Sequence, residues 1–140
     1  MTQPIATSIY ALFDAAKAAF SCAYAPYSRF SVGAAILADD GRIYAAANVE
    51  NAAYPAGTCA EAGAIAAMIS AGARRITKIM VIGDGDALCT PCGACRQRIR
   101  EFADQDCPIH IAGPEGVRAS FTLSTLLPYS FGPDHLDRKE

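Results

Sequence analysis

Two short cysteine-containing segments of this chain combine residue types that bind metals. One is Cys59-Ala60-Glu61 and the other is Pro91-Cys92-Gly93-Ala94-Cys95. Cys92 and Cys95 are three residues apart, so at the start of a helix both thiols face the same side. Zinc takes four ligands, and three thiolates leave its fourth position to water, as in catalytic zinc sites. The spacing therefore predicts an open zinc site formed by Cys59, Cys92 and Cys95.

Glu61 is the residue expected to work beside this metal. It follows Cys59 by two positions, so on a helix its side chain points away from that thiol and is not expected to bind the same ion. Its carboxylate can still reach a water molecule on the zinc, whose pKa the metal lowers toward ~7. A carboxylate in that place can accept the proton and deliver it elsewhere. This pairing is typical of hydrolytic chemistry at an electrophilic carbon.

Other interpretations of the cysteines stay open at this point. A C-x-x-C pair also occurs in redox motifs and as half of a structural zinc site. Cys89 is evenly spaced before the pair and is the best local fourth ligand for structural zinc. Otherwise Cys22, Cys89 and Cys107 are expected to pack as small apolar side chains. The catalytic site is preferred because neither a redox pair nor a structural zinc needs the upstream Glu61.

Helices alternating with short strands are predicted to position these segments. Thr58 is the expected cap of the helix that begins at Cys59, and Gly72 is expected to end it. The expected elements are a helix over 5–23, hairpin strands over 30–38 and 43–49, a helix over 59–70, a strand over 76–82, a helix over 91–102, strands over 109–112 and 119–123, and a helical turn over 124–127.

This order predicts the fold class. Helices inserted between strands favour a sheet covered on both faces, so we expect one α/β domain over residues 1–140. Its architecture is predicted to be a three-layer α/β/α sandwich with a mixed five-stranded sheet. The two hairpin strands should be antiparallel, and later strands parallel where a helix crosses over.

Composition narrows the classes of partner. Hydrophobic residues make up 52% of the chain and charged residues 19%, which excludes a disordered chain. The net charge of −2 shows no basic excess for nucleic-acid phosphates, so no nucleic-acid partner is expected. No apolar run reaches the ~20 residues that span a bilayer, and Met1-Thr2-Gln3-Pro4 does not read as a secretory signal. The lack of such segments, together with cysteines that are expected to bind metal or pack as thiols, predicts a cytoplasmic protein without a membrane partner.

Several segments together resemble the zinc-dependent cytidine deaminases, in particular the short homotetrameric type. The resemblance covers nearly the whole chain and is carried by residues 27–35, 48–54, 59–61, 91–97 and 126–133. It implies a cytidine deaminase-like fold with one Zn²⁺ per chain, and Glu61 as the proton shuttle. The implied reaction converts free cytidine and deoxycytidine into uridine and deoxyuridine plus ammonia, in pyrimidine salvage. A modified or antibiotic nucleoside as substrate, or a non-catalytic zinc-stabilised binding module, are the alternatives.

The resemblance also implies residues that contact the nucleoside. Asn48 and Glu50 match positions that bind the ribose 3′-hydroxyl, and an amide and a carboxylate suit that task. Phe30 matches an aromatic residue that packs on the base. Ala60 is expected to offer backbone contacts to the amide edge of the base.

A homotetramer with composite sites is implied by three further positions. Ala52 and Tyr54 match a segment that approaches the ribose 5′ end in a neighbouring subunit. Phe131 matches a C-terminal aromatic residue that closes over a neighbour's pocket. Each site is therefore expected to be completed by an adjacent subunit.

One position departs from the family pattern. Many short deaminases carry arginine directly after the catalytic glutamate, where it offsets thiolate charge, but this chain has Ala62. Three thiolates on Zn²⁺ leave a formal charge of −1. We expect backbone N–H groups at the two helix starts to compensate more of this negative charge, with Arg96 as another source of positive charge.

Overall fold

The computed structural model describes residues 9–136, which form one mixed sheet with its helices. Its elements are α2 (Tyr10–Ser21), β1 (Val32–Ala38), β2 (Ile43–Ala47), the 3₁₀ helix η1 (Tyr54–Ala56), α3 (Ala60–Ser70), β3 (Ile76–Gly83), α4 (Gly93–Phe102), β4 (Pro108–Gly113), β5 (Gly116–Thr122), α5 (Leu123–Leu126) and the 3₁₀ helix η2 (Pro133–Leu136).

The five strands lie in the order β2-β1-β3-β4-β5. β1 is antiparallel to both of its neighbours, β3 and β4 are parallel, and β5 returns antiparallel to β4. The helix α4 thus connects adjacent parallel strands, while α3 crosses from β2 over β1 to β3. The predicted mixed five-stranded sheet is confirmed, including the antiparallel hairpin of β1 and β2.

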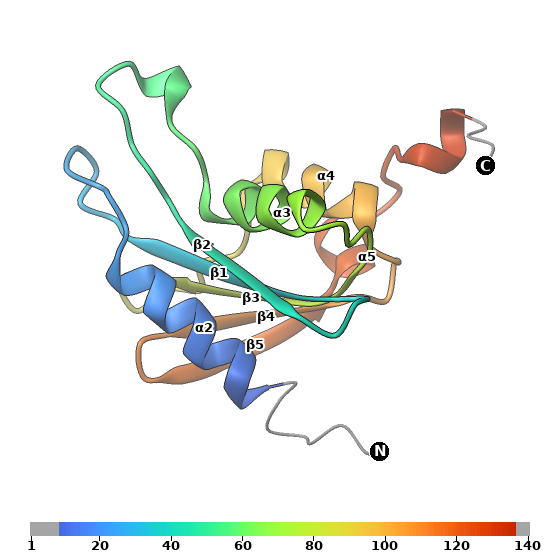
Figure 1. The fold of residues 1–140 in the computed structure, drawn as a ribbon, viewed down its shortest axis with the longest axis horizontal. Helices are drawn as coiled ribbons and strands as arrows, with labels where there is room; N and C mark the ends of the chain where they lie inside the picture. Colours follow the sequence, from blue (N-terminus) through green and yellow to red (C-terminus); the bar gives the residue numbers. More distant parts are fainter. Residues whose placement is uncertain (1–8, 137–140) are drawn as a thin grey trace.

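The sheet separates two helical layers. α3 and α4 cover one face and α2 covers the other (Figure 1). Alternate residues of β1 serve the two layers, because successive strand side chains point to opposite faces. Ala34 and Ile36 belong to the core under α3 and α4, whereas Ala35 packs with Leu12 and Ala16 of α2. The predicted three-layer α/β/α arrangement is therefore confirmed.

The absence of a side chain at Gly33 allows α2 to approach β1 closely. A Cβ atom at this position would overlap the carbonyl oxygen of Ala16 and lie 2.6 Å from the backbone nitrogen of Phe20. Any larger residue would therefore push the helix away from the strand. This contact fixes the distance between the helix and the sheet.

The hairpin strands are shorter than predicted. β1 begins at Val32 instead of residue 30, because the amide of Ser31 donates to Asp84 instead of joining the ladder. β2 ends at Ala47 instead of residue 49, and Val49 forms isolated bridges to Tyr24 and Thr58. Part of the predicted first helix, including Ile5, lies outside the described residues.

The predicted helix starts need correction. Thr58 does not cap α3, because its backbone is extended and exchanges two hydrogen bonds with Val49, each 2.9 Å long. Cys59 occupies the N-cap position, and Cys92 does the same for α4, which begins at Gly93 and not at Pro91. Gly72 follows the end of α3 with a φ of +100°, as expected for a helix-ending glycine.

The remaining elements differ by a few residues from expectation. β3 extends to Gly83, β4 and β5 are longer than predicted, and α5 begins at Leu123. The sequence did not predict η1 and η2.

Within residues 9–136, none of the helices has the length and apolar character required to cross a bilayer.

Candidate active site

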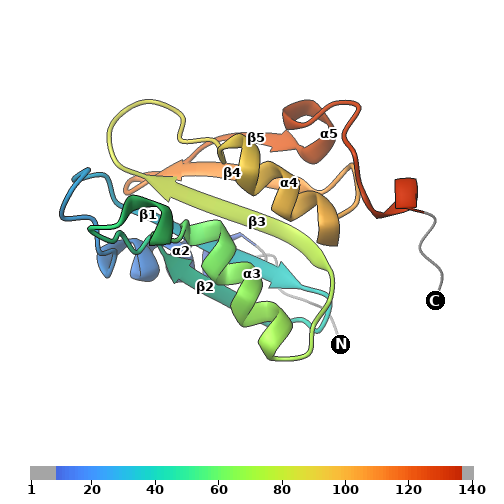
Figure 2. The same ribbon diagram turned by 90° about the horizontal axis from the view of Figure 1, so that it is seen from above.

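The starts of α3 and α4 lie together on one face of the sheet. Both helices run side by side from the same end of the sheet (Figure 2). Cys59 and Cys92 are their N-cap residues, both with extended backbone, and Cys95 lies in the first turn of α4. The fold therefore brings three thiols from two distant segments to one place.

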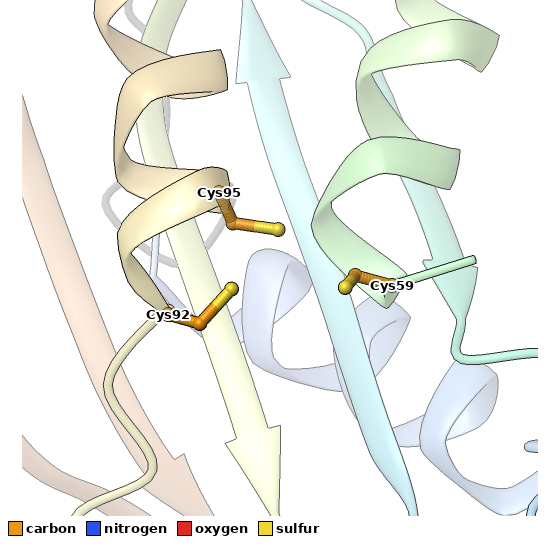
Figure 3. A group of neighbouring side chains, drawn as sticks. All are labelled: Cys59, Cys92 and Cys95. Carbon is orange, nitrogen blue, oxygen red and sulfur yellow. The ribbon is translucent and has the colours of Figure 1, made fainter. Parts of the chain in front are cut away.

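The three thiols point toward one another (Figure 3). Their sulfur atoms all lie within 4.8 Å of one another. Zinc–sulfur bonds of about 2.3 Å in a tetrahedron hold the sulfurs about 3.8 Å apart, so small side-chain rotations bring all three onto one ion. The donor set and its spacing fit zinc. Cys89 is outside this group among the described residues, so the structure does not offer it as a fourth ligand.

The environments of the thiols differ. The backbone N–H of Cys95 is the main cause of a lowered pKa at Cys92, and the N–H of Ala94 adds to it. These donors belong to the start of α4, as expected for a helix N-terminus. Cys95 is buried, and its burial, with the nearby Glu61 and Cys59, raises its pKa well above the ordinary range. Its thiolate form therefore depends on positive charge nearby.

Glu61 is a buried carboxyl group in the first turn of α3, with 5% of its surface exposed. Burial raises the pKa of Glu61, while its own backbone amide, the Cys95 thiol and the Arg98 guanidinium oppose that rise. Burying a carboxylate is costly, so such groups concentrate at functional sites. The structure thus places the predicted proton carrier directly beside the sulfur cluster.

A cleft of about 460 Å³ opens beside the sulfur cluster. It is lined by residues 27–28, 48–51, 54 and 57–59, and Cys59 joins it to the metal-binding group. Three of the predicted substrate residues, Asn48, Glu50 and Tyr54, are among the lining residues. Its volume is in the range of small-molecule sites.

Asn48 and Glu50 also build the wall of this cleft. The Asn48 amide donates to the carbonyl of Phe30 (2.9 Å) and accepts from the amide of Val32 (3.0 Å). The Glu50 carboxylate accepts from the amides of Tyr27 (2.9 Å) and Ser28 (3.1 Å) and from the Ser28 hydroxyl. These bonds hold the pKa of Glu50 below its usual value, with the Ser28 hydroxyl as the main cause.

The other predicted substrate residues are not among the residues that line this cleft. Ala60 is fully buried behind Cys59, and the exposed ring of Phe30 lies beside Gly83. Among the described residues of this single chain, Ala52 and Phe131 are not part of the lining. Phe131 is 57% exposed and stacks on His135 in the C-terminal segment, with a centroid separation of 5.0 Å.

The sequence analysis did not assign roles to several lining residues. Tyr27 and Ser28 line the cleft and donate hydrogen bonds to Glu50, and Thr58 lines the cleft as well. The first two belong to the segment 27–35 that carries the family resemblance, which was a usable signal. Thr58 gave no such signal beyond its expected helix cap.

Comparisons with known proteins agree with this geometry. The family model of the cytidine and deoxycytidylate deaminase zinc-binding region matches residues 7–111. The chain belongs to this deaminase family. A cytidine deaminase of Sporosarcina psychrophila is 41% identical over 125 residues, covering 89% of this chain and 92% of the relative. Members are zinc-dependent hydrolases, and the three-cysteine group accounts for the metal.

Solved cytidine deaminases share the fold. The crystal structure from Burkholderia pseudomallei has a TM-score of 0.80 and 39% identity, covering 94% of this chain and 100% of the other. That from Mycobacterium tuberculosis has a TM-score of 0.75 and 38% identity, covering 88% and 96%. These similarities confirm the cytidine deaminase-like fold.

In this member of the deaminase family, Arg96 does not face the thiols. Its Nε donates to the carbonyl of Pro91 (2.7 Å), Nη1 to that of Leu126 (2.7 Å), and Nη2 to the hydroxyl of Thr90 (3.0 Å). Arg96 therefore ties α4 to the segments around it. Arg98 is the cation that lies beside the cluster. The sequence analysis did not predict this contact, because a charged residue on the exposed face of a helix is usually solvated.

Proposed function

We propose that this deaminase hydrolyses free cytidine and deoxycytidine to uridine and deoxyuridine, with release of ammonia. The observation that carries the proposal is the placement of the buried Glu61 beside the three-cysteine group, next to a cleft of about 460 Å³. A carboxyl group in that position has the reach and the environment for proton transfer.

Cys59, Cys92 and Cys95 would hold one Zn²⁺ per chain, which supplies a Lewis acid that makes water nucleophilic near neutral pH. Glu61 accepts a proton from the attacking water and gives it to ring N3. After water has added to C4, Glu61 takes the second proton from the new C4 hydroxyl and passes it to the amino group, so the C4–N bond breaks, ammonia leaves and the C4 carbonyl forms. Burial raises the pKa of Glu61 above that of an ordinary glutamate, which favours a group that must hold the proton it accepts and then donate it.

The nucleoside is held by groups at the wall of the cleft. Asn48 keeps a second amide hydrogen, and Glu50 keeps acceptor capacity, beyond the bonds that each makes within the chain. Both serve the ribose 3′-hydroxyl, so ribose and deoxyribose are accepted. Phe30 packs on the base, and the backbone of Ala60 contacts its amide edge.

A homotetramer completes these sites in the proposal. Large aromatic side chains are exposed around the cleft and the tail, with Tyr54 at 75% and Phe131 at 57% exposure. Grouped exposed apolar side chains commonly mark contact surfaces, and Tyr54 lies beside the exposed Tyr27 with 6.0 Å between the ring centroids. Ala52 and Tyr54 would approach a neighbour's ribose, and Phe131 would close over a neighbour's pocket. Light scattering at assay concentration measures the assembly, and a fully active monomer would contradict it.

The proposed setting is pyrimidine salvage in the cytoplasm. All six cysteines are free thiols in the structure, which suits a reducing compartment. The products of free-nucleoside deamination supply a salvage reaction that consumes uracil nucleosides. Fractionation of the source cells with an antibody to the protein tests the location.

Ultraviolet absorbance of cytidine and deoxycytidine, with zinc-loaded protein, tests the reaction. Wild type should remove the cytosine band, and Glu61→Gln should slow this by at least about 100-fold while retaining zinc and fold. Glu115→Gln, at an exposed carboxylate paired with Arg118, is the matched control. Zinc-loaded wild type without turnover would point to a modified nucleoside or to a zinc-stabilised binding module.

A further inference from the structure

A groove of about 420 Å³ runs between α3 and α4. Ala62 lines it from α3, and Arg98 lines it from α4. The guanidinium Nη1 of Arg98 donates a hydrogen bond to the sulfur of Cys95, with 3.3 Å between the two atoms. Arg98 therefore places a positive charge beside Cys95, the most buried of the three thiols.

Negative charge on the sulfurs of Cys92 and Cys95 is stabilised by different groups. Cys92 accepts backbone N–H groups at the start of the helix. Cys95 faces the carboxyl of Glu61 and the thiol of Cys59, both of which oppose a negative charge on its sulfur. The side-chain donor of Arg98 counters them through its hydrogen bond to the Cys95 sulfur.

The Arg98 guanidinium matters because the metal centre would carry negative charge. Three thiolates on a divalent ion carry a net negative charge, and Glu61 adds another beside them. Arg96 is engaged by three acceptors elsewhere. The small side chain of Ala62 leaves the α3 side of the groove without a cation at that position.

We propose that Arg98 is a positioning residue of the metal centre, which fixes the sulfur of Cys95 and offsets the negative charge of the three thiolates from α4. It acts through Cys95 and does not touch the substrate. A guanidinium introduced at position 62 would reach the same cluster from the opposite wall of the groove. The inference rests on the zinc centre of the proposed function but not on the identity of the nucleoside.

Zinc affinity measured by competition with a chromogenic chelator tests the proposal. Arg98→Ala should weaken zinc binding about tenfold, because groups that support a ligand usually change metal affinity by ~10- to 100-fold. Arg98→Lys should recover most of the loss, and the double variant Arg98→Ala/Ala62→Arg part of it. Arg42→Ala, which removes a cation from the exposed turn after β1, is the control.

The absorption of the cobalt-substituted protein gives a second readout. Loss of the hydrogen bond at Cys95 should shift the thiolate-to-cobalt charge-transfer band to lower energy in Arg98→Ala, and Arg98→Lys should return it. Wild-type affinity and an unshifted band in Arg98→Ala would overturn the proposal. So would equal losses in the alanine, lysine and double variants.

These readouts separate the two proposals. If wild type does not deaminate cytidine but the zinc affinities follow the expected order, the substrate assignment fails and the role of Arg98 stands. If cytidine is deaminated and the affinities do not change, the role of Arg98 fails alone. Far-UV circular dichroism of each variant confirms that the fold is retained.

Discussion

Arg100 on α4 forms an ion pair with Asp134 in the C-terminal segment, with 2.7 Å between Nη2 and Oδ1. The same guanidinium donates through Nε to the hydroxyl of Ser130, and Gln97 donates to the carbonyl of Phe131. The segment that carries Phe131 is thus fastened to the helix that carries two of the three thiols.

Releasing this segment should impair substrate binding more than chemistry. We expect Arg100→Ala to raise KM severalfold with a smaller change in kcat, since Phe131 loses its fixed place while Glu61 keeps its own. Steady-state kinetics on cytidine measures the split. Arg42→Ala is the control for loss of one surface cation. Unchanged KM would show that the tail does not contribute to the site.

Removing a thiol should remove the metal. Cys92→Ala leaves two of the three sulfur donors, so we expect zinc content to fall from one per chain to a small fraction after dialysis. Elemental analysis of the purified protein measures the content. Cys22→Ala, at an exposed cysteine outside the group, should keep one zinc per chain. Full zinc occupancy in Cys92→Ala would refute the assigned ligand set.

The half-buried ring of His110 should make stability depend on pH. Its Nε2 is buried without a hydrogen-bond partner, and Nδ1 lies 2.7 Å from the Ser120 hydroxyl. Burial, and then the charge of Lys78, lowers the pKa of His110 from its ordinary 6.5.

The sign of this dependence follows from the shift. Below the ordinary pKa the unfolded chain gains a proton that the folded chain refuses, so stability falls as pH drops from 6.5 toward the lowered pKa. Denaturant unfolding of wild type and His110→Gln should show the wild type losing more stability over that window. Parallel curves for the two proteins would rule out this contribution.

Adding one methyl group at Gly33 should destabilise the fold. A Cβ there would lie 2.6 Å from the Phe20 nitrogen, so α2 must move away from β1. Overpacking of this kind costs about 1–3 kcal/mol of unfolding free energy. Urea unfolding measures it. Gly93→Ala, where a Cβ has nothing within 4 Å, is the comparison and should differ little from wild type when all proteins are unfolded without zinc, since position 93 lies between two proposed zinc ligands.

The sequence predicted the fold and the metal-binding group because both depend on simple spacing. Apolar periodicity located the sheet and the long helices, and two cysteines three apart at a helix start have one geometry. Thr58 failed as a cap because pairing with Val49 determines its backbone, and a contact across the chain is not visible in a local pattern.

The contact between Arg98 and Cys95 shows why the rest of the site was not predicted. An arginine on the exposed side of a helix is usually solvated, and its approach to a sulfur is set by the rotamer and by the groove beside α3. Likewise the bonds of Asn48 to the strand β1 depend on hairpin register. The roles of Asn48, Glu50 and Phe131 toward substrate stay predictions.

The convergence of Cys59 with Cys92 and Cys95 also makes the stability of the folded chain depend on the supply of zinc. One ion joins the starts of two helices that are separated by the whole of α3 and β3, and so it closes a long loop. Because the unfolded chain does not present these sulfurs together, bound zinc favours the folded state. Each tenfold rise of free zinc above its dissociation constant adds about 1.4 kcal/mol to the free energy of unfolding. Zinc starvation would therefore reduce the amount of this protein as well as its turnover.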